Sequence, residues 1–171
     1  YLISSELYDD ALYALNRLNT DSIANPNMQD SVNYYIGWIK YFKQDFHGAI
    51  ASFSAVESSS VVVASSFYNS ICYIQIDSLA KARYVLQNLD VSSDAKLDNL
   101  KILQLRGISL LERDFTSYDS LSALSVERSF ITESEMNEMT NYADLMRSYK
   151  RKSPWIAGLL SAIVPGLGKL Y

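Results

Sequence analysis

Few side chains in this sequence have types and spacings that could support catalysis. Two segments fit the Ser-x-x-Lys pattern of acyl-transfer enzymes with a serine nucleophile, Ser78 to Lys81 (SLAK) and Ser93 to Lys96 (SDAK). Both lie where a helix is expected to begin, and a serine there usually caps the helix. Because no companion motif of that chemistry is present, we interpret both serines as helix caps.

The single histidine and the single cysteine limit metal and thiol chemistry. His47 falls at a helical position expected to be exposed, without a serine or cysteine spaced to pair with it. Cys72 lies in an apolar helical segment, where an isolated cysteine acts as a small hydrophobe. One cysteine excludes an intramolecular disulfide and a thiolate-rich metal site. With no glycine-rich phosphate loop either, we predict no enzyme activity, no metal and no cofactor.

The composition predicts a folded helical chain that is acidic over most of its length. Of 171 residues, 49% are hydrophobic, and only six are glycine and three proline. The formal charge is -4, but residues 147–171 hold five basic and no acidic residues, which leaves -9 on residues 1–146. Phosphate binding needs a positive surface, so we expect no nucleic-acid partner.

An apolar pattern recurs along the chain with the period of a helical hairpin. Its best example lies in the segment 34–56, where a helix with a small residue in its middle is followed by a second helix with a buried stripe. The stripe recurs 33 residues later and 38 residues earlier. The three stripes are Ala49-Phe53-Val56, Ala82-Leu86-Leu89 and Ala11-Leu15-Leu18, and the small residues are Gly37 and Ser70.

Two further helical segments extend the pattern. A third pair over residues 96–124 has its register open by one or two residues, and a capping box from Thr132 to Glu135 predicts a last helix to about residue 150. The valines 61–63 favour a strand locally but lead into a helical pattern, so we expect a helix there. The third pair is marked by Gly107, Phe115, Ser117, Leu121 and Leu124, and the last helix by Met136, Met139, Ala143, Met146 and Tyr149.

These residues resemble the tetratricopeptide repeat family, which has a small residue in the first helix of each hairpin and an aromatic-alanine-aromatic series in the second. The best match is Phe46, Ala49 and Phe53. The pattern departs at Lys40, where the family has tyrosine, and no closing proline follows a hairpin. The resemblance implies an all-α array of three to four antiparallel hairpins in a right-handed solenoid. Another antiparallel helical bundle would also place alanines at close crossings.

Family members hold a peptide or partner helix on a concave face lined by the first helices. The equivalent positions here are equally compatible with core residues, and large aromatic anchors favour Trp38 and Tyr41. The resemblance thus implies a protein or peptide partner on the concave face formed by Tyr34, Trp38, Tyr41, Phe67, Ile71 and Ile74.

The last twenty residues have a different composition. Sixteen uncharged residues, 153–168, follow a basic cluster, and cations, a tryptophan and an apolar run are typical of a segment that meets a bilayer. A helix of that length covers about 24 Å, less than the roughly 30 Å of hydrocarbon core. A buried C-terminal helix is the alternative. The expected membrane contacts are Lys150, Arg151, Lys152, Trp155, Leu159, Leu160 and Ile163.

The run from Ala157 through Pro165-Gly166-Leu167-Gly168 to Tyr171 is similar to the opening of TM2-like bacterial membrane domains, which are helical hairpins. It implies that the chain stops inside a membrane module, and a start at Tyr1 implies at least an initiator methionine upstream. The positive-inside tendency would place residues 150–152 in the cytoplasm. The family resemblance favours a periplasmic repeat domain at the bacterial inner membrane, which we expect.

The leading hypothesis is a non-enzymatic scaffold tethered at a bacterial membrane. Its expected parts are repeats over residues 1–130, a capping or linker helix over 131–152 and a membrane-associated segment over 153–171. The alternative is an accessory domain of a membrane protein that assists the biogenesis or transport of envelope proteins. In that case the membrane module is the functional part, and the repeats dock or regulate.

Overall fold

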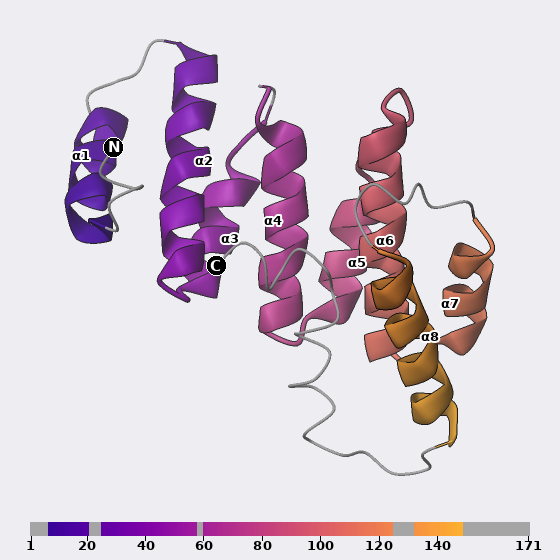
Figure 1. Ribbon diagram of the computed structural model, residues 1–171. Helices are drawn as coiled ribbons and strands as arrows, with labels where there is room; N and C mark the ends of the chain where they lie inside the picture. Colours follow the sequence, from indigo (N-terminus) through magenta and orange to yellow (C-terminus); the bar gives the residue numbers. More distant parts are fainter. Residues whose placement is uncertain (1–6, 21–24, 58–59, 125–131, 149–171) are drawn as a thin grey trace. The chain divides into compact units, whose positions relative to one another are not determined.

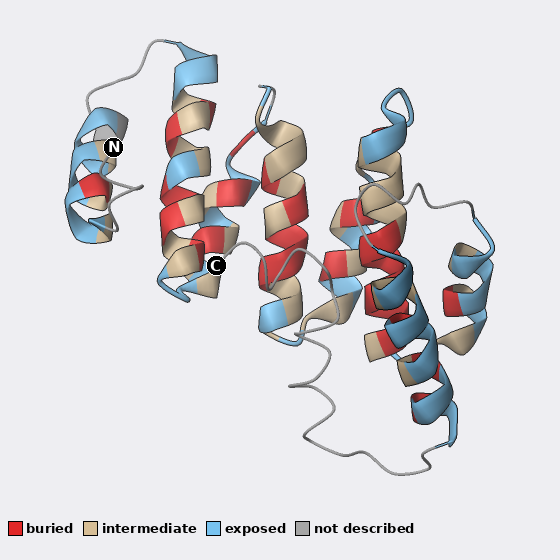
Figure 2. Ribbon diagram, viewed as in Figure 1, coloured by how far each residue is buried: buried red, intermediate tan, exposed pale blue. Residues whose placement is uncertain are grey.

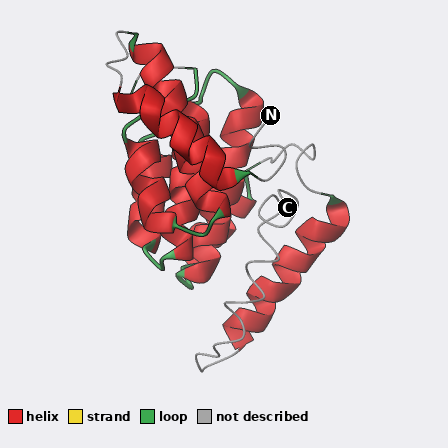
Figure 3. Cartoon of the chain, turned by 90° about the vertical axis from the view of Figure 1, so that its left-hand side faces the viewer, coloured by secondary structure: helices red, strands yellow, loops and turns green. Residues whose placement is uncertain are grey.

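The described part of the protein is all-helical. The computed structural model describes residues 7–20, 25–57, 60–124 and 132–148, and within these ranges it contains helices and no strand (Figures 1 and 3). The predicted fold class is confirmed, including the helix that begins beside the three valines. The helices are α1 (Tyr8–Thr20), α2 (Pro26–Phe42), α3 (Phe46–Ser54), α4 (Val62–Gln75), α5 (Leu79–Gln87), α6 (Ala95–Leu111), α7 (Phe115–Ser122) and α8 (Glu133–Ser148).

Three hairpins, α2–α3, α4–α5 and α6–α7, share one turn geometry. In each turn the middle residue has a positive φ, of 61° at Gln44, 57° at Asp77 and 59° at Arg113. The three N–H groups of each turn donate to carbonyls four, three and five residues earlier, as in a Schellman motif. The next helix then begins at once, and Asp45 caps α3 by accepting from the N–H of Gly48 at 2.9 Å. The hairpins therefore repeat in backbone geometry as well as in sequence.

The common turn aligns the three hairpins residue by residue. Counted from the turn, Gly37 corresponds to Ser70 and to Arg106, and Ala49 corresponds to Ala82 and to Tyr118. The predicted small position of the third hairpin, Gly107, is wrong by one residue. The sequence pattern left that register open by one or two residues, because Arg106 and Tyr118 stand where the other hairpins have a small residue and an alanine.

In the first two hairpins the helices cross closely at small residues, as the pattern predicts. Ala49 and Ala82 are fully buried, as is Ser70. A Cβ added to Gly37 would lie 2.8 Å from the ring of Phe53 on the facing helix. The ring of Phe53 thus fills the space that the missing side chain of Gly37 leaves. Figure 2 shows buried positions on both α2 and α3.

The chain divides into two compact units, residues 1–90 and 91–171. In the first unit α2 packs on α1 and α3, and α4 packs on α3, α5 and α2. In the second unit α6 packs on α7. The boundary expected near residue 130 lies outside the described residues.

Helix α8 completes the core of the second unit. Its buried residues Met139, Ala143 and Met146 join Leu103 and Leu110 of α6 and Tyr118 of α7 in one apolar cluster. The predicted capping box is confirmed, since Thr132 Oγ1 accepts from the N–H of Glu135 at 3.2 Å, and the Thr132 N–H donates to the Glu135 carboxylate at 2.8 Å.

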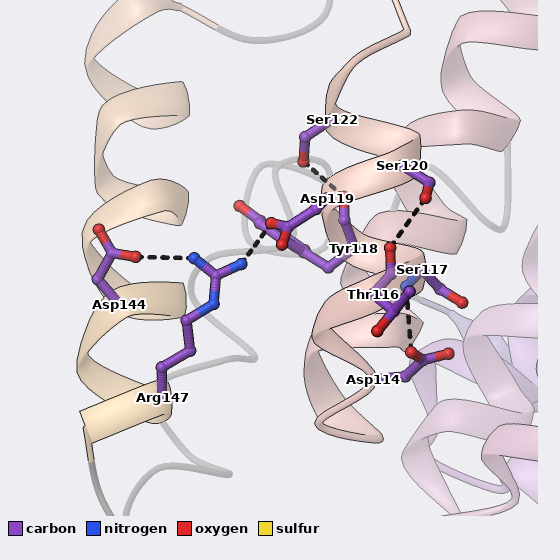
Figure 4. A network of polar contacts seen from close by, with 9 residues as sticks. All are labelled: Asp114, Thr116, Ser117, Tyr118, Asp119, Ser120, Ser122, Asp144 and Arg147. Atoms are coloured by element: carbon purple, nitrogen blue, oxygen red, sulfur yellow. Dashed lines mark hydrogen bonds and ion pairs between the residues drawn. The ribbon is translucent and has the colours of Figure 1, made fainter.

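Polar contacts fasten the C-terminal end of α8 to the hairpin. Figure 4 shows Arg147 between Asp144 of its own helix, at 3.0 Å, and Asp119 of α7. The hydrogen bond to Asp119 is the main cause that raises the pKa of this guanidinium. Arg113 donates from Nη2 to the carbonyl of Met146 at 3.3 Å. The two ion pairs of Arg147 are exposed and therefore contribute little to stability.

Candidate functional site

Nine aromatic side chains form a continuous cluster in the first unit. Its ring pairs have centroids 4.3–6.4 Å apart, within the range of stacked and edge-to-face contacts. The rings come from α1, α2, α3 and α4, so the cluster joins four helices. Its members, here called the aromatic cluster, are Tyr8, Tyr34, Tyr35, Trp38, Tyr41, Phe42, Phe46, Phe53 and Tyr68.

One stripe of this cluster is only partly buried. Tyr34, Trp38 and Phe42 follow one another at every fourth position of α2 and therefore share one face of it. The Trp38 ring meets Phe42 edge-on at 4.3 Å, and its Nε1–H donates to the hydroxyl of Tyr68 at 3.3 Å. All three stripe residues are partly exposed. This surface, here called the α2 stripe, is a partly exposed aromatic area on one helix face.

Tyr34 remains a hydrogen-bond donor on the stripe. Burial is the largest cause that raises the pKa of its hydroxyl from 10.0 to about 12, followed by the neighbouring Tyr68 and Tyr35. Its ring lies 5.3 Å from Tyr35 and 6.3 Å from Tyr68. The stripe therefore stays uncharged at physiological pH, and its polar atoms are a phenol and an indole N–H.

The six predicted concave-face residues separate into two groups. Tyr41, Phe67 and Ile71 are 7%, 6% and 6% exposed, so their side chains belong to the core. Tyr34, Trp38 and Ile74 are partly exposed. A role in partner binding remains a prediction for all six, and only the second group presents side-chain surface without rearrangement.

Sequence reasoning missed two residues that complete the surface around Trp38. Phe42 lies four residues beyond Trp38, so helical spacing alone could have identified it. Tyr68 comes from α4, and its ring also stacks on Phe53 with centroids 5.6 Å apart. No local signal marks it, because its place beside Trp38 depends on how α4 packs against α2 and α3.

The residues considered for catalysis have structural places. Ser78 stands at the N-cap of α5 but accepts no hydrogen bond there, and Ser93 precedes the cap of α6, which is Asp94. Asp94 accepts from the N–H of Lys96 at 2.9 Å. The cap interpretation is thus confirmed in position for Ser78, and for Ser93 it is wrong by one residue.

The histidine and the cysteine lie as the sequence predicts. His47 is exposed on α3, and Cys72 is fully buried in α4. Burial raises the pKa of the Cys72 thiol from 9.0 to about 12, which disfavours the reactive thiolate. No group of three or more His, Cys, Asp or Glu side chains that could hold a metal ion occurs among residues 7–20, 25–57, 60–124 and 132–148.

The predicted membrane contacts, residues 150–163, lie outside the described residues. Within the described ranges, no helix has the length and apolar character needed to cross a bilayer.

Comparison of the chain with protein-family models, with curated proteins and with solved structures finds no match.

Proposed function

We propose that this protein is a non-enzymatic interaction scaffold tethered at a bacterial membrane, whose first unit binds a peptide or partner protein on the α2 stripe. The observation that carries the proposal is a partly exposed aromatic surface held rigid by its neighbours. Trp38 is fixed by the hydroxyl of Tyr68 and the edge of Phe42. Fixed aromatic side chains lose little entropy on binding and are common energetic centres of interfaces.

The repeated hairpins support a tetratricopeptide-like array as the framework of this scaffold. Three turns share one hydrogen-bond pattern, and the first two crossings use slim residues, Gly37 with Ala49 and Ser70 with Ala82. A hairpin with this arrangement cannot bury its apolar face alone and therefore stacks on its neighbours. In such arrays the first helices of successive hairpins form the binding face, which here includes α2 and α4.

Attachment to the bacterial inner membrane, with the repeats in the periplasm, rests on the sequence of residues 150–171. The basic cluster, Trp155 and the apolar run suit contact with a bilayer. Binding of the full chain and of a chain ending at residue 148 to phosphatidylglycerol vesicles tests this part. Equal sedimentation of both with the vesicles would remove the tether from the proposal.

A photo-crosslinking experiment tests the stripe directly. A benzophenone amino acid in place of Phe42 is expected to crosslink one partner in bacterial envelope preparations. The matched control carries the same group in place of Tyr84, an exposed aromatic residue on α5. Trp38→Ala should reduce the crosslink at position 42 at least tenfold, since loss of a central aromatic anchor costs about 2 kcal/mol or more.

The experiment must distinguish a Trp38→Ala protein that no longer folds from one that folds but lacks the aromatic anchor. Tyr68→Phe removes the acceptor of the Trp38 hydrogen bond but keeps the ring, so it should change the crosslink less than Trp38→Ala does. Equal crosslinking at positions 42 and 84, or an undiminished crosslink in a folded Trp38→Ala protein, would contradict the assignment.

The second candidate is a docking domain for a membrane module that assists envelope biogenesis or transport. It is favoured by the resemblance of residues 157–171 to TM2-like hairpins. Deletion of residues 1–146 distinguishes the two functions. Only the docking-domain function predicts residual activity in cells that carry the deletion.

A further inference from the structure

The third hairpin contains a buried arginine where the first two have a small residue. Arg106 occupies the position of Gly37 and Ser70 and is only 2% exposed. Facing it, Tyr118 replaces the alanine of the other hairpins and is 3% exposed. A side chain that carries a fixed positive charge is thus enclosed at a helix crossing.

The contacts of this arginine include no carboxylate among the described residues. Its Cζ lies 5.4 Å from the centroid of the Tyr118 ring. Its Nη1 donates to Sδ of Met136 on α8 at 3.2 Å, and a thioether is a weak acceptor. The Nε–H of Arg106 and the hydroxyl of Tyr118 are buried without a hydrogen-bond partner in the described structure.

The carboxylates of α7 and of its cap are engaged elsewhere. Asp114 accepts from the N–H of Ser117 at 3.1 Å as the cap of α7, and Asp119 pairs with Arg147 (Figure 4). Arginine stays protonated in proteins, and a buried charge without a counterion is costly. The ring of Tyr118 offsets part of this cost through a cation–π contact. An oxyanion would supply the missing acceptor and the missing charge together.

The charge of Arg106 and its apolar neighbours indicate which kind of anion would bind there. One guanidinium is neutralised by one negative charge, whereas a doubly charged phosphate would leave a net charge in the same enclosure. On α6, Leu103 and Leu110 flank Arg106 at three and four residues' distance, and both belong to the apolar cluster of the second unit. A singly charged carboxylate with a short hydrocarbon tail matches both features.

We propose that Arg106 and Tyr118 form a binding site for a small apolar monocarboxylate, which enters by displacing the side chain of Met136. The carboxylate accepts from Nε and Nη2 of Arg106, which lie on one side of the planar guanidinium, and from the hydroxyl of Tyr118, and its tail lies against the apolar cluster. Met136 is only half-buried, and its unbranched side chain can adopt other rotamers. The site is separate from the α2 stripe, which belongs to the other unit.

An internal carboxylate tests the geometry without added ligand. In the full chain, Met136→Glu places a carboxylate where the thioether now meets Arg106 and should raise the melting temperature by roughly 2–4 °C. Combined with Arg106→Met, a substitution of similar length without charge, the same glutamate should give no gain. An equal effect in both backgrounds would overturn the proposal.

A ligand titration gives the second readout. Sodium butyrate should raise the melting temperature of the wild-type chain above that in sodium chloride of equal ionic strength, and it should shift the NMR signal of the Arg106 Nε–H downfield. Acetate, which lacks most of the tail, should act more weakly. An unmoved Nε–H signal would overturn the site even if Arg106→Met failed to fold, and a larger Arg106-dependent effect of phosphate would overturn the monocarboxylate assignment.

Discussion

The first and the third hairpin share one turn geometry but differ in the residues at which their two helices cross. In both, a residue with positive φ joins the helices, and an aspartate caps the second one. At the crossing, Gly37 meets the ring of Phe53 in the first hairpin, whereas Arg106 meets the ring of Tyr118 in the third. Backbone hydrogen bonds fix the turn, and side-chain volume and charge then decide what the crossing can do.

The same comparison explains why the hairpins depend on different apolar residues. Phe53 is buried in the first hairpin, and its equivalent in the third, Ser122, is exposed. The ring of Tyr118 occupies the third crossing, so nothing large is needed one turn later. Helix α8 supplies Met139 and Met146 to the core of that unit.

The largest expected difference in stability is between substitutions at Phe53 and Ser122, which occupy equivalent positions in the second helices of the first and the third hairpin. Phe53→Ala should lower the free energy of unfolding by about 3–5 kcal/mol, because it empties a buried site that touches Gly37 and Tyr68. Ser122→Ala removes only an exposed hydroxyl that bonds its own helix, and should stay within about 0.5 kcal/mol. Urea denaturation followed by circular dichroism measures both, and similar losses would contradict the alignment of the hairpins.

Smaller effects are expected at the small positions of the first two hairpins. The two substitutions should change the free energy of unfolding in opposite directions. Gly37→Ala should destabilise by about 1 kcal/mol, because overpacking against Phe53 costs about 1–3 kcal/mol and better helix propensity returns about 1 kcal/mol. Ser70→Ala adds no volume and removes a buried hydroxyl without a hydrogen-bond partner in the described residues. It should stabilise by about 0.5–1 kcal/mol.

Both small-position variants are measured in the same urea series. If Gly37→Ala proved as stable as the wild type, the close approach of α2 and α3 would not limit the first crossing. If Ser70→Ala destabilised the protein, the hydroxyl would have an acceptor that offsets its burial.

A pH response of the first unit gives a further comparison between the two units. Burial raises the pKa of Cys72 from 9.0 to about 12, and mainly burial raises that of Tyr34 from 10.0 to about 12; both belong to the first unit. The native state holds these protons more tightly than the unfolded state. Their contribution to stability is therefore complete below about pH 9 and declines as the pH rises from there toward about 12.

Cys72→Ala is the variant that tests this response. Its free energy of unfolding should fall less than that of the wild type between about pH 8 and about pH 10.5, because one of the two groups no longer titrates. Urea midpoints at the two pH values measure the difference. Equal declines would show that the thiol ionises as readily in the native state as in the unfolded chain.

Much of the local structure could be predicted from the sequence. The capping box at Thr132, the stripe of α3 and the helix after the three valines all depend on residues within a few positions of one another. The register of the third hairpin was left open, because Arg106 and Tyr118 replace the small residue and the alanine that mark the crossings of the other two hairpins. Asp114, which caps α7 as Asp45 caps α3, is the signal that could have fixed it.

The candidate surface was predicted only in part. The family resemblance placed Tyr34, Trp38 and Tyr41 on the binding face and aromatic size favoured Trp38 and Tyr41, yet the structure buries Tyr41. A helical pattern states which residues share a face, but exposure depends on the neighbouring helix. Tyr68 illustrates this, since it reaches Trp38 from thirty residues further along the chain.

The sequence by itself determined the helices, the capping box at Thr132 and the period of the hairpins, because hydrogen bonds and side-chain contacts within one helical turn depend on nearby residues alone. Only the tertiary structure decided which aromatic residues form a surface and that Arg106 is enclosed without a carboxylate from the part of the chain that the structure describes. Both depend on side chains brought from other helices, Tyr68 to the α2 stripe and Met136 to the third crossing. Burial and pairing are properties of those assembled neighbours, which no local spacing encodes.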